Sequence, residues 1–325
     1  MSSTGLQCRY LADDQSANPD TFLAKVVFDP YCIASAETGY ISTGLKLLDG
    51  EPLCEVFTTS ASTIERGKSH NCAWAKTDEL MLLALWANES LYDGLQQATQ
   101  HTYDALLQTC REHGYPFLVK VWNYFADINR IDSELERYRQ FCMGRFDAFA
   151  THGIGEDQFP AACALGHGGG DLLVYALVSK TPVQHIENPL QASAYRYPAE
   201  YGPRSPSFAR ATLLTIGETT RVYVSGTASV VGYLTRHPGE LELQIQVTLE
   251  NLDCLLKHIA SAYQQTPSFE AEVLKVYVRN PADLAIIKAH ISQAYPAVPT
   301  VYVAAAICRS DLLLEVDGIW KLIAQ

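Results

Sequence analysis

The chain of 325 residues is long enough for two domains of ordinary size, and its hydrophobic content of 48% can supply a core for each. Its 24 Lys and Arg residues against 36 Asp and Glu residues give a net charge of −12, which argues against a nucleic-acid or anionic-membrane surface. The N-terminal residues lack the pattern of a signal or transit peptide, and no apolar stretch reaches membrane-spanning length. We therefore expect a cytoplasmic protein, in which a few arginines could still bind a small anionic molecule.

The cysteines exclude further classes of protein. They number nine, are scattered along the chain and include no Cys-x-x-Cys pair. This usage is typical of reduced thiols that serve as small apolar residues. We therefore expect neither a disulfide framework nor a metal site.

The first half of the chain predicts a mixture of strands and helices. From Phe22 to Phe57, apolar runs alternate with Gly, Pro and Asp turns, which is typical of a strand meander. Apolar residues at helical spacing from Asp93 to His113 predict a helix that stops at Gly114. The other elements expected here are a strand over Ala73–Ala87, a strand over Phe117–Phe125 and a helix over Ser133–Ala150.

The region from Thr151 to Pro206 is rich in Gly and Pro and is expected to connect two domains. Its GHGGGD motif, Gly166 to Asp171, has two interpretations: a tight turn before the strand LLVYALV, or a phosphate-binding loop. No GK[ST] follows and no GxGxxG spacing is present, so the turn is favoured. We expect domains at residues 1–150 and 207–325, joined by residues 151–206.

The second half repeats the pattern of the first. The run Leu118–Trp122 corresponds to Leu274–Tyr277, and in both halves one helix precedes this strand and another follows it. We therefore predict an α+β fold of two similar units, each a mixed sheet backed by two helices, with the sheets packed face to face. The elements predicted in the second half are strands over Phe208–Leu214, Arg221–Val231 and Ala271–Val278, and helices over Leu243–Tyr263 and Pro281–Ala294.

The most informative stretch is Val301 to Ile319, which reads VYVAAAICRSDLLLEVDGI. Two apolar, β-prone runs flank the polar residues Cys308 to Asp311, a pattern that predicts a buried hairpin. The period of two in a strand directs Glu315 toward an apolar face, where burial would raise its pKa and make it a proton donor. The alternative is that Glu315 pairs with an arginine or faces water at the end of the sheet.

Several motifs resemble the YjgF/RidA superfamily. The blocks SGTASVV, QVTLENLDCLL, EVLKVYVRNPADL and VYVAAAICRSDLLLEVDG are similar, in order and spacing, to that family's strand, helix, strand and C-terminal signature. The similarity extends from Phe208 to Ile319. RidA-type deaminases have an arginine near the position of Thr300, and this chain lacks it.

The whole chain resembles the chorismatase family, whose members are similar to two fused RidA-like units. The motifs ERYRQFCMGR (Glu136 to Arg145) and YGPRSPSFARA (Tyr201 to Ala211) carry this resemblance. The chain is most similar to bifunctional 3- and 4-hydroxybenzoate synthases of the xanthomonadin and ubiquinone pathways. The resemblance implies a cofactor-free enzyme that removes pyruvate from chorismate and releases 3- and 4-hydroxybenzoate.

The resemblance also implies roles for single residues. Glu315 corresponds to the family's proton donor, and Cys308 together with Gly226 or Ala228 influences the product. In the family, a cysteine at the position of Cys308 accompanies an intramolecular route to 3-hydroxybenzoate, whereas an alanine accompanies hydrolysis to a dihydrodiol acid. Cys308 has no histidine near it in sequence, so we interpret it as a residue that shapes the site and not as a nucleophile.

A substrate with two carboxylates needs cationic partners. Arg204 lies in a stiff loop between two prolines, where it could bind a carboxylate or simply be solvated. Arg145 and Arg279 are further candidates for binding a carboxylate. The alternative for Arg145 is that it stabilises a helix end, and the alternative for Arg279 is that it ends its strand in solvent. Small residues in the SGTAS strand would let a flat ring approach the backbone, or could form a bulge. The candidate substrate-binding residues are Tyr201, Arg204, Arg210, Arg145, Arg279, Gly226, Thr227 and Ala228.

Two other functions stay open from the sequence: a RidA-like protein that binds a small carboxylate without turnover, and an imine deaminase. A buried Glu315 opposite several arginines would favour the chorismate-cleaving enzyme, whereas an exposed Glu315 would favour the binding protein. The partner we expect is the small molecule chorismate, with no nucleic acid and no membrane, in a monomer or small homo-oligomer.

Overall fold

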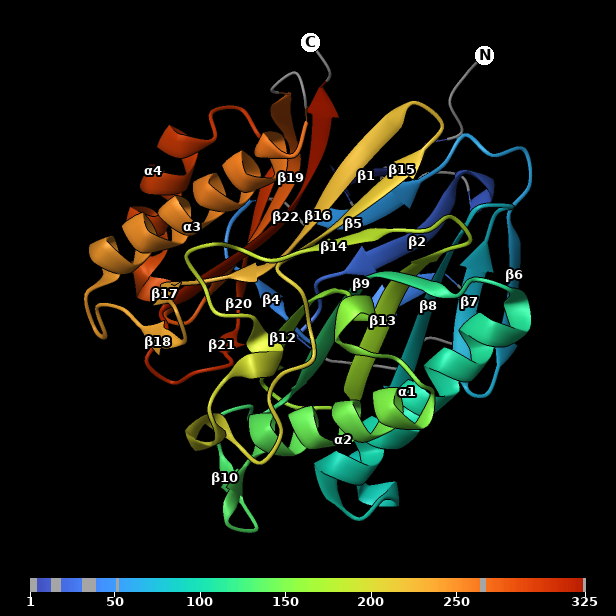
Figure 1. The fold of residues 1–325 in the computed structure, drawn as a ribbon, viewed down its shortest axis with the longest axis horizontal. Coiled ribbons are helices and arrows are strands. Elements are labelled where there is room, and N and C mark those ends of the chain that lie inside the picture. Colours follow the sequence, from blue (N-terminus) through green and yellow to red (C-terminus); the bar gives the residue numbers. More distant parts are fainter. Residues whose placement is uncertain (1–4, 13–18, 31–38, 51–52, 264–266, 324–325) are drawn as a thin grey trace.

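The computed structural model describes residues 5–12, 19–30, 39–50, 53–263 and 267–323 (Figure 1). In these ranges the chain forms two seven-stranded sheets, a four-stranded sheet and two short two-stranded ribbons. The helices are α1 (Gly94–His113), α2 (Arg137–Thr151), α3 (Leu241–Ser261) and α4 (Leu284–Ala294). The predicted α+β fold class is confirmed.

The first seven-stranded sheet has the order β21-β12-β9-β13-β8-β7-β6. Its neighbouring strands are antiparallel except β12 and β9, which are parallel. Helices α1 and α2 cover its outer face through apolar residues such as Leu106 and Phe141. The strands are β6 (Glu65–Ser69), β7 (Cys72–Lys76), β8 (Leu80–Ala87), β9 (Phe117–Ala126), β12 (Ala161–His167), β13 (Leu172–Ser179) and β21 (Ala306–Ile307).

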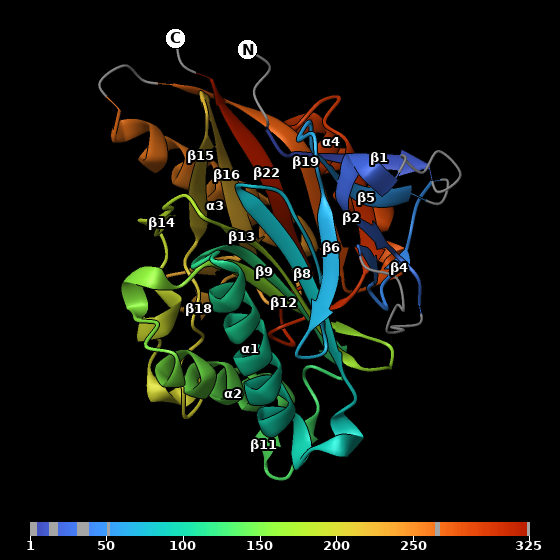
Figure 2. The same cartoon turned by 90° about the vertical axis from the view of Figure 1, so that its right-hand side faces the viewer.

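The second seven-stranded sheet has the order β14-β15-β16-β22-β19-β20-β4. Here β19 and β20 form the parallel pair, and the others are antiparallel. Helices α3 and α4 cover its outer face, on the opposite side of the molecule from α1 and α2 (Figure 2). The strands are β4 (Lys46–Leu47), β14 (Gln184–Ile186), β15 (Ala211–Ile216), β16 (Thr219–Thr227), β19 (Ser268–Val278), β20 (Thr300–Ala304) and β22 (Leu314–Ile323).

The two sheets have the same topology. The strand orders can be compared by starting at β21 in the first sheet and at β4 in the second. Then β12 matches β20, β9 matches β19 and β13 matches β22, so the parallel pair has the same position in both sheets. The predicted repeat is therefore present, and it aligns Lys120 and Trp122 of β9 with Lys275 and Tyr277 of β19.

The inner faces of the sheets pack against each other. One core cluster contains Trp122 and Tyr175 from the first sheet together with Tyr277 and Val303 from the second. The four-stranded sheet packs onto the same core and contributes Glu55, whose carboxylate lies 2.7 Å from the Lys275 ammonium. Its order is β1-β5-β2-β3, with β1 (Gln7–Ala12), β2 (Phe22–Val27), β3 (Tyr40–Ser42) and β5 (Leu53–Thr58).

Several local predictions are confirmed and others need correction. Gly114 ends α1 with φ +78°, in the left-handed region that favours glycine. The apolar run expected as one strand, residues 73–87, forms β7 and β8, because the Thr77 hydroxyl accepts bonds from the backbone of Glu79 and Leu80 and turns the chain. Helix α2 begins at Arg137 and not at residue 133, because a ribbon precedes it. That ribbon pairs β10 (Ile131–Asp132) with β11 (Leu135–Glu136).

The predicted C-terminal hairpin is wrong. Strands β20 and β22 are not neighbours, because β19 lies between them and bonds to both. The chain between them crosses to the first sheet, where β21 pairs with β12. Both apolar runs are strands, as expected. The sequence of a short apolar run does not, however, determine which strand it pairs with.

The first sheet extends past the expected domain boundary at residue 150. Strands β12 and β13 lie within the region predicted as a connection, and they are inner strands of this sheet. Each sheet also takes an edge strand from a distant part of the sequence, β21 in the first and β4 in the second. The division into three segments at residues 150 and 206 stays a prediction. Among the described residues, no helix is long and apolar enough to cross a membrane.

Candidate active site

A cavity of about 410 Å³ is lined by residues from both units. This volume lies within the range of small-molecule sites, about 300–1,000 Å³. One wall is formed by β22 and the turn before it, which carry Glu315, Cys308 and Arg309. Other parts of the lining come from the start of α2 and from the loop before β15, with Glu136, Tyr138, Arg139, Tyr197, Tyr201 and Arg210.

Glu315 is the buried acid of this cavity. It lies on β22 opposite Tyr277 of β19, and only 4% of its surface is exposed, so the water-facing alternative does not apply. A Cβ atom on Gly226 would lie 1.8 Å from Glu315 Oε1, so only glycine leaves room for the carboxyl group there. Burial raises the pKa of Glu315 to about 8, Asp317 adds to the rise, and Lys120 and Arg210 oppose it. Burial therefore favours the protonated form of Glu315.

Cys308 lies in the same wall. Burial, followed by the nearby Glu315, raises the pKa of its thiol to about 12. The thiol is therefore neutral and a poor nucleophile, which agrees with its interpretation as a shaping residue.

Three arginines line the cavity: Arg139, Arg210 and Arg309. The Arg210 guanidinium is buried and donates to the Ala192 carbonyl and the Tyr197 hydroxyl, both at 2.8 Å. Its Nε is buried and has no hydrogen-bond partner among the described residues. The arginines give the cavity the cationic groups that a dianionic molecule needs, although the chain as a whole is acidic.

Two tyrosines hold Arg309 in place. Its guanidinium carbon lies 4.5 Å from the ring centre of Tyr201 and 5.3 Å from that of Tyr197. Its Nη1 also donates to the Tyr233 carbonyl at 2.8 Å and to the Thr235 hydroxyl at 3.3 Å, so stacking and hydrogen bonds together restrict this long side chain.

Arg279 organises the turn that carries Cys308 and Arg309. It donates to the Leu312 carbonyl at 2.6 Å, to the Arg309 carbonyl at 2.7 Å and to the Ile307 carbonyl at 3.0 Å. Arg279 is thus half-buried within the protein, and it does not end its strand in solvent. Its contacts fix the shape of the cavity wall without lining the cavity.

The structure brings together part of the predicted site. The predicted residues that line the cavity are Glu315, Cys308, Tyr201, Arg210, Gly226 and Ala228. Arg204 is exposed and packs over the Phe146 ring at 4.2 Å. Arg145 is buried over the Phe141 ring in the outer core of the first unit, and the Thr227 hydroxyl donates to the Ser225 carbonyl. These three residues lie outside the cavity lining.

Sequence reasoning missed Arg139, Arg309 and Tyr197. Arg309 could have been found from the sequence, because it is the cation of the polar turn and directly follows Cys308. Arg139 stands in the ERYRQFCMGR motif, where the spacing alone does not separate it from Arg145. The neighbour Asp317 could have been found from the period of two, since it follows Glu315 by two residues on the same strand.

Among the residues that the structure describes, no group of three His, Cys, Asp or Glu side chains could hold a metal ion. The eight described cysteines are free thiols, and Cys32 lies outside the described residues.

Fold and site together define a duplicated α+β protein with a cavity, lined by three arginines, beside a buried carboxyl group whose pKa is raised. The family model for the N-terminal part of FkbO/Hyg5-like chorismatases matches residues 55–178. A 3-hydroxybenzoate synthase from Streptomyces hygroscopicus is 37% identical, over 83% of this chain and 82% of its own length. A chorismatase from the same organism is 33% identical, over 98% and 95% of the two chains.

A solved structure is also similar to this chain over its whole length. The crystal structure of a chorismatase superposes with a TM-score of 0.88 and 30% sequence identity, over the full length of both chains. The chain belongs to the chorismatase family.

Proposed function

We propose that this protein cleaves chorismate to pyruvate and hydroxybenzoate, with Glu315 as the proton donor. The observation that carries the proposal is the buried Glu315, whose pKa is raised by burial, in the wall of a cavity that three arginines line. Two of its relatives are named as a chorismatase and a 3-hydroxybenzoate synthase, which supports the same conclusion.

The chemistry of chorismate fits this arrangement. Chorismate carries two carboxylates and an enolpyruvyl ether whose terminal carbon is weakly basic. Arg139, Arg210 and Arg309 would bind the carboxylates, and Glu315 would protonate the methylene carbon. The ether carbon then becomes an oxocarbenium-like centre, and cleavage of the bond to the ring releases pyruvate.

The overall reaction balances without a cofactor. Pyruvate and hydroxybenzoate together contain all the atoms of chorismate, so no water is consumed. The proton that pyruvate gains is matched by one that the ring loses on becoming aromatic, and this proton can restore Glu315. Hydrolysis to a dihydrodiol acid, in contrast, consumes one water.

The product depends on whether water reaches the oxocarbenium-like centre. We propose that Cys308 fills the space that such a water would need, and that this favours the intramolecular route to 3-hydroxybenzoate. Cys308 together with Ala228 lines the cavity, a combination that resembles the bifunctional synthases of the xanthomonadin and ubiquinone pathways. The proposal therefore includes 4-hydroxybenzoate as a second product.

The alternative, a binding protein without turnover, is less well supported. Such a protein needs cations for the carboxylates but has no use for a protonated carboxyl group that costs burial energy. The 4% exposure of Glu315 favours the enzyme.

Replacing the proton donor should abolish most of the activity. Glu315→Gln keeps the shape of the side chain but cannot donate a proton, so pyruvate release from chorismate should fall by about 10²- to 10⁴-fold. Chorismate binding, measured by calorimetry, should change little. Pyruvate release at a near-normal rate from this variant would rule out Glu315 as the donor.

Two arginine variants test which cations bind the substrate. Arg309→Ala removes a cavity guanidinium and should lower kcat/KM by about 10- to 1,000-fold. Arg204→Ala is the matched control, because Arg204 is exposed outside the cavity and its loss should change kcat/KM less than about threefold. A large effect of Arg204→Ala with a small effect of Arg309→Ala would reverse the assignment.

The product ratio tests the role of Cys308. Cys308→Ala removes a sulfur atom and opens room for about one ordered water. Chromatography of the products should show a shift from 3-hydroxybenzoate toward the non-aromatic diol. An unchanged ratio would mean that Cys308 only packs in the cavity wall.

A further inference from the structure

A second carboxylate, Asp317, lies beside the proton donor but outside the cavity lining. It follows Glu315 by two residues on β22, so both side chains point to the same face of the sheet, into the space between the two units. Asp317 is 4% exposed, and it has no role in the proposed cleavage of chorismate.

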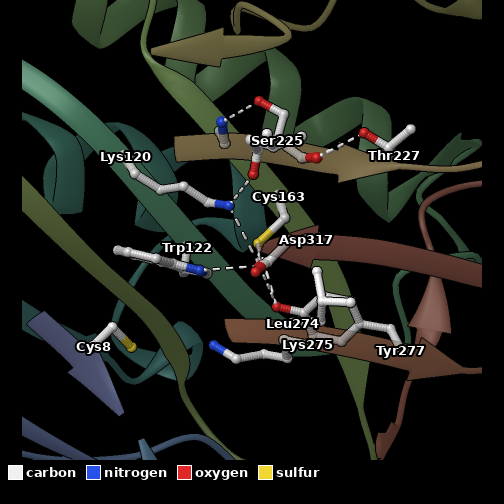
Figure 3. Close-up of polar contacts among 12 residues, drawn as sticks. Cys8, Lys120, Trp122, Cys163, Ser225, Thr227, Leu274, Lys275, Tyr277 and Asp317 are labelled. Atoms are coloured by element: carbon white, nitrogen blue, oxygen red, sulfur yellow. Dashed lines mark hydrogen bonds and ion pairs between the residues drawn. The ribbon is translucent and has the colours of Figure 1, made fainter. Parts of the chain in front are cut away.

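Four donors converge on one oxygen of Asp317 (Figure 3). Oδ2 accepts from the Tyr277 hydroxyl at 2.9 Å, from Trp122 Nε1 at 3.1 Å and from the Cys163 thiol at 3.6 Å, and Lys120 Nζ lies at 3.5 Å. An indole N–H and an ammonium group can only donate, so this oxygen must be an acceptor. The arrangement is that of an ionised carboxylate, and the pKa of Asp317 is lowered by Lys120 and Lys275 against the effect of burial.

The charges between the sheets are balanced without Glu315. Lys120 pairs with Asp317, and Lys275 pairs with Glu55 at 2.7 Å. Two buried cations therefore face two buried anions. An ionised Glu315 would be a third carboxylate in an apolar interior whose lysines are already paired.

We propose that Asp317 is a positioning residue for the proton donor: its fixed negative charge, held in place by Lys120 and Trp122 of the first unit, keeps the proton on Glu315 until chorismate takes it. This inference rests on the proposed role of Glu315 and adds to it a residue that touches no substrate.

The other groups that face Glu315 do not replace Asp317 in this role. Lys120 on β9 and Arg210 before β15 are cations, and they favour loss of the proton. Burial raises the pKa of Cys163 on β12, of Tyr277 on β19 and of Cys308, so these groups are neutral. The carboxylates of Glu136 and Asp311 also line the cavity, but Asp317 is the anion whose charge raises the pKa of Glu315.

The duplication explains where the supporting residues come from. In the first unit Trp122 lies opposite Tyr175, and in the second unit the matching Tyr277 lies opposite Glu315. The first unit therefore has a tyrosine in place of the acid. Its Lys120 and Trp122 instead cross the interface and bind the anion next to the acid of the second unit.

The test is the pH dependence of pyruvate release by Asp317→Asn. Asparagine keeps the shape and an acceptor oxygen but removes the charge, so Glu315 should lose its proton more easily. The alkaline pH at which kcat/KM falls to half its plateau should move down by about one unit relative to the wild type. An unmoved alkaline limb would overturn the inference.

Glu55→Gln is the matched control for a merely structural effect. It removes the other buried carboxylate of the same network, which pairs with Lys275 and not with Lys120. This variant should lose stability in thermal denaturation as Asp317→Asn does, yet its alkaline limb should stay where it is in the wild type. An equal shift in both variants would also overturn the inference.

A second comparison serves if Asp317→Asn fails to fold because Lys120 loses its partner. Lys120→Met and the double variant Lys120→Met/Asp317→Asn differ only in the charge of residue 317. In the double variant, kcat/KM should fall to half its plateau at a lower alkaline pH than in Lys120→Met. The same pH in both variants would contradict the inference. Glu315→Gln distinguishes a failure of the proposed function from a failure of this inference. If Glu315→Gln keeps its activity, the proposed function is wrong. If Glu315→Gln is inactive but the Asp317 variants show no shift, only the role of Asp317 is wrong.

Discussion

Two lysine–carboxylate pairs buried between the sheets constrain the rest of the structure. Lys120–Asp317 joins the first unit to the second, and Lys275–Glu55 joins the small N-terminal sheet to the second unit. Breaking one partner of such a pair leaves a buried charge alone, at a cost of roughly 3–5 kcal/mol. The pairs therefore fix how β9 lies against β22, and with it the place of Glu315 beside the cavity.

The cavity depends on contacts that lie outside it. Arg279 binds three carbonyls of the turn that carries Cys308 and Arg309, and Gly226 leaves the space that the Glu315 carboxyl group occupies. Rigid groups of this kind hold reacting atoms in place and keep bulk water out, which a route without added water requires. The duplicated fold supplies this support because one unit carries the acid and the other supplies three of the four donors around Asp317.

Much of the fold was predictable from the sequence, because helix spacing, Gly114 and the repeated strand motif are local signals. The pairing of the strands was not, since β19 separates the two runs that predicted a hairpin, and a strand's partner depends on distant residues. In the site, an acid among leucines marked Glu315. Charge and loop stiffness pointed to Arg204, however, and only the packed structure shows that Arg309 faces the cavity.

To act as the proton donor, Glu315 must be protonated in the folded protein at neutral pH. Its pKa is about 8 when folded against a usual value of 4.5, so the folded state holds one proton more than the unfolded state between these pH values. The contribution of Glu315 to the free energy of unfolding therefore falls as pH rises through this window, by a few kcal/mol in order of magnitude. The decisive measurement is this free energy by urea denaturation from pH 5 to pH 9, for the wild type and for Glu315→Gln, which has no proton to lose. We expect the wild type to lose stability relative to Glu315→Gln as the pH rises, whereas a difference that stays constant across the range would show that Glu315 is already ionised at neutral pH.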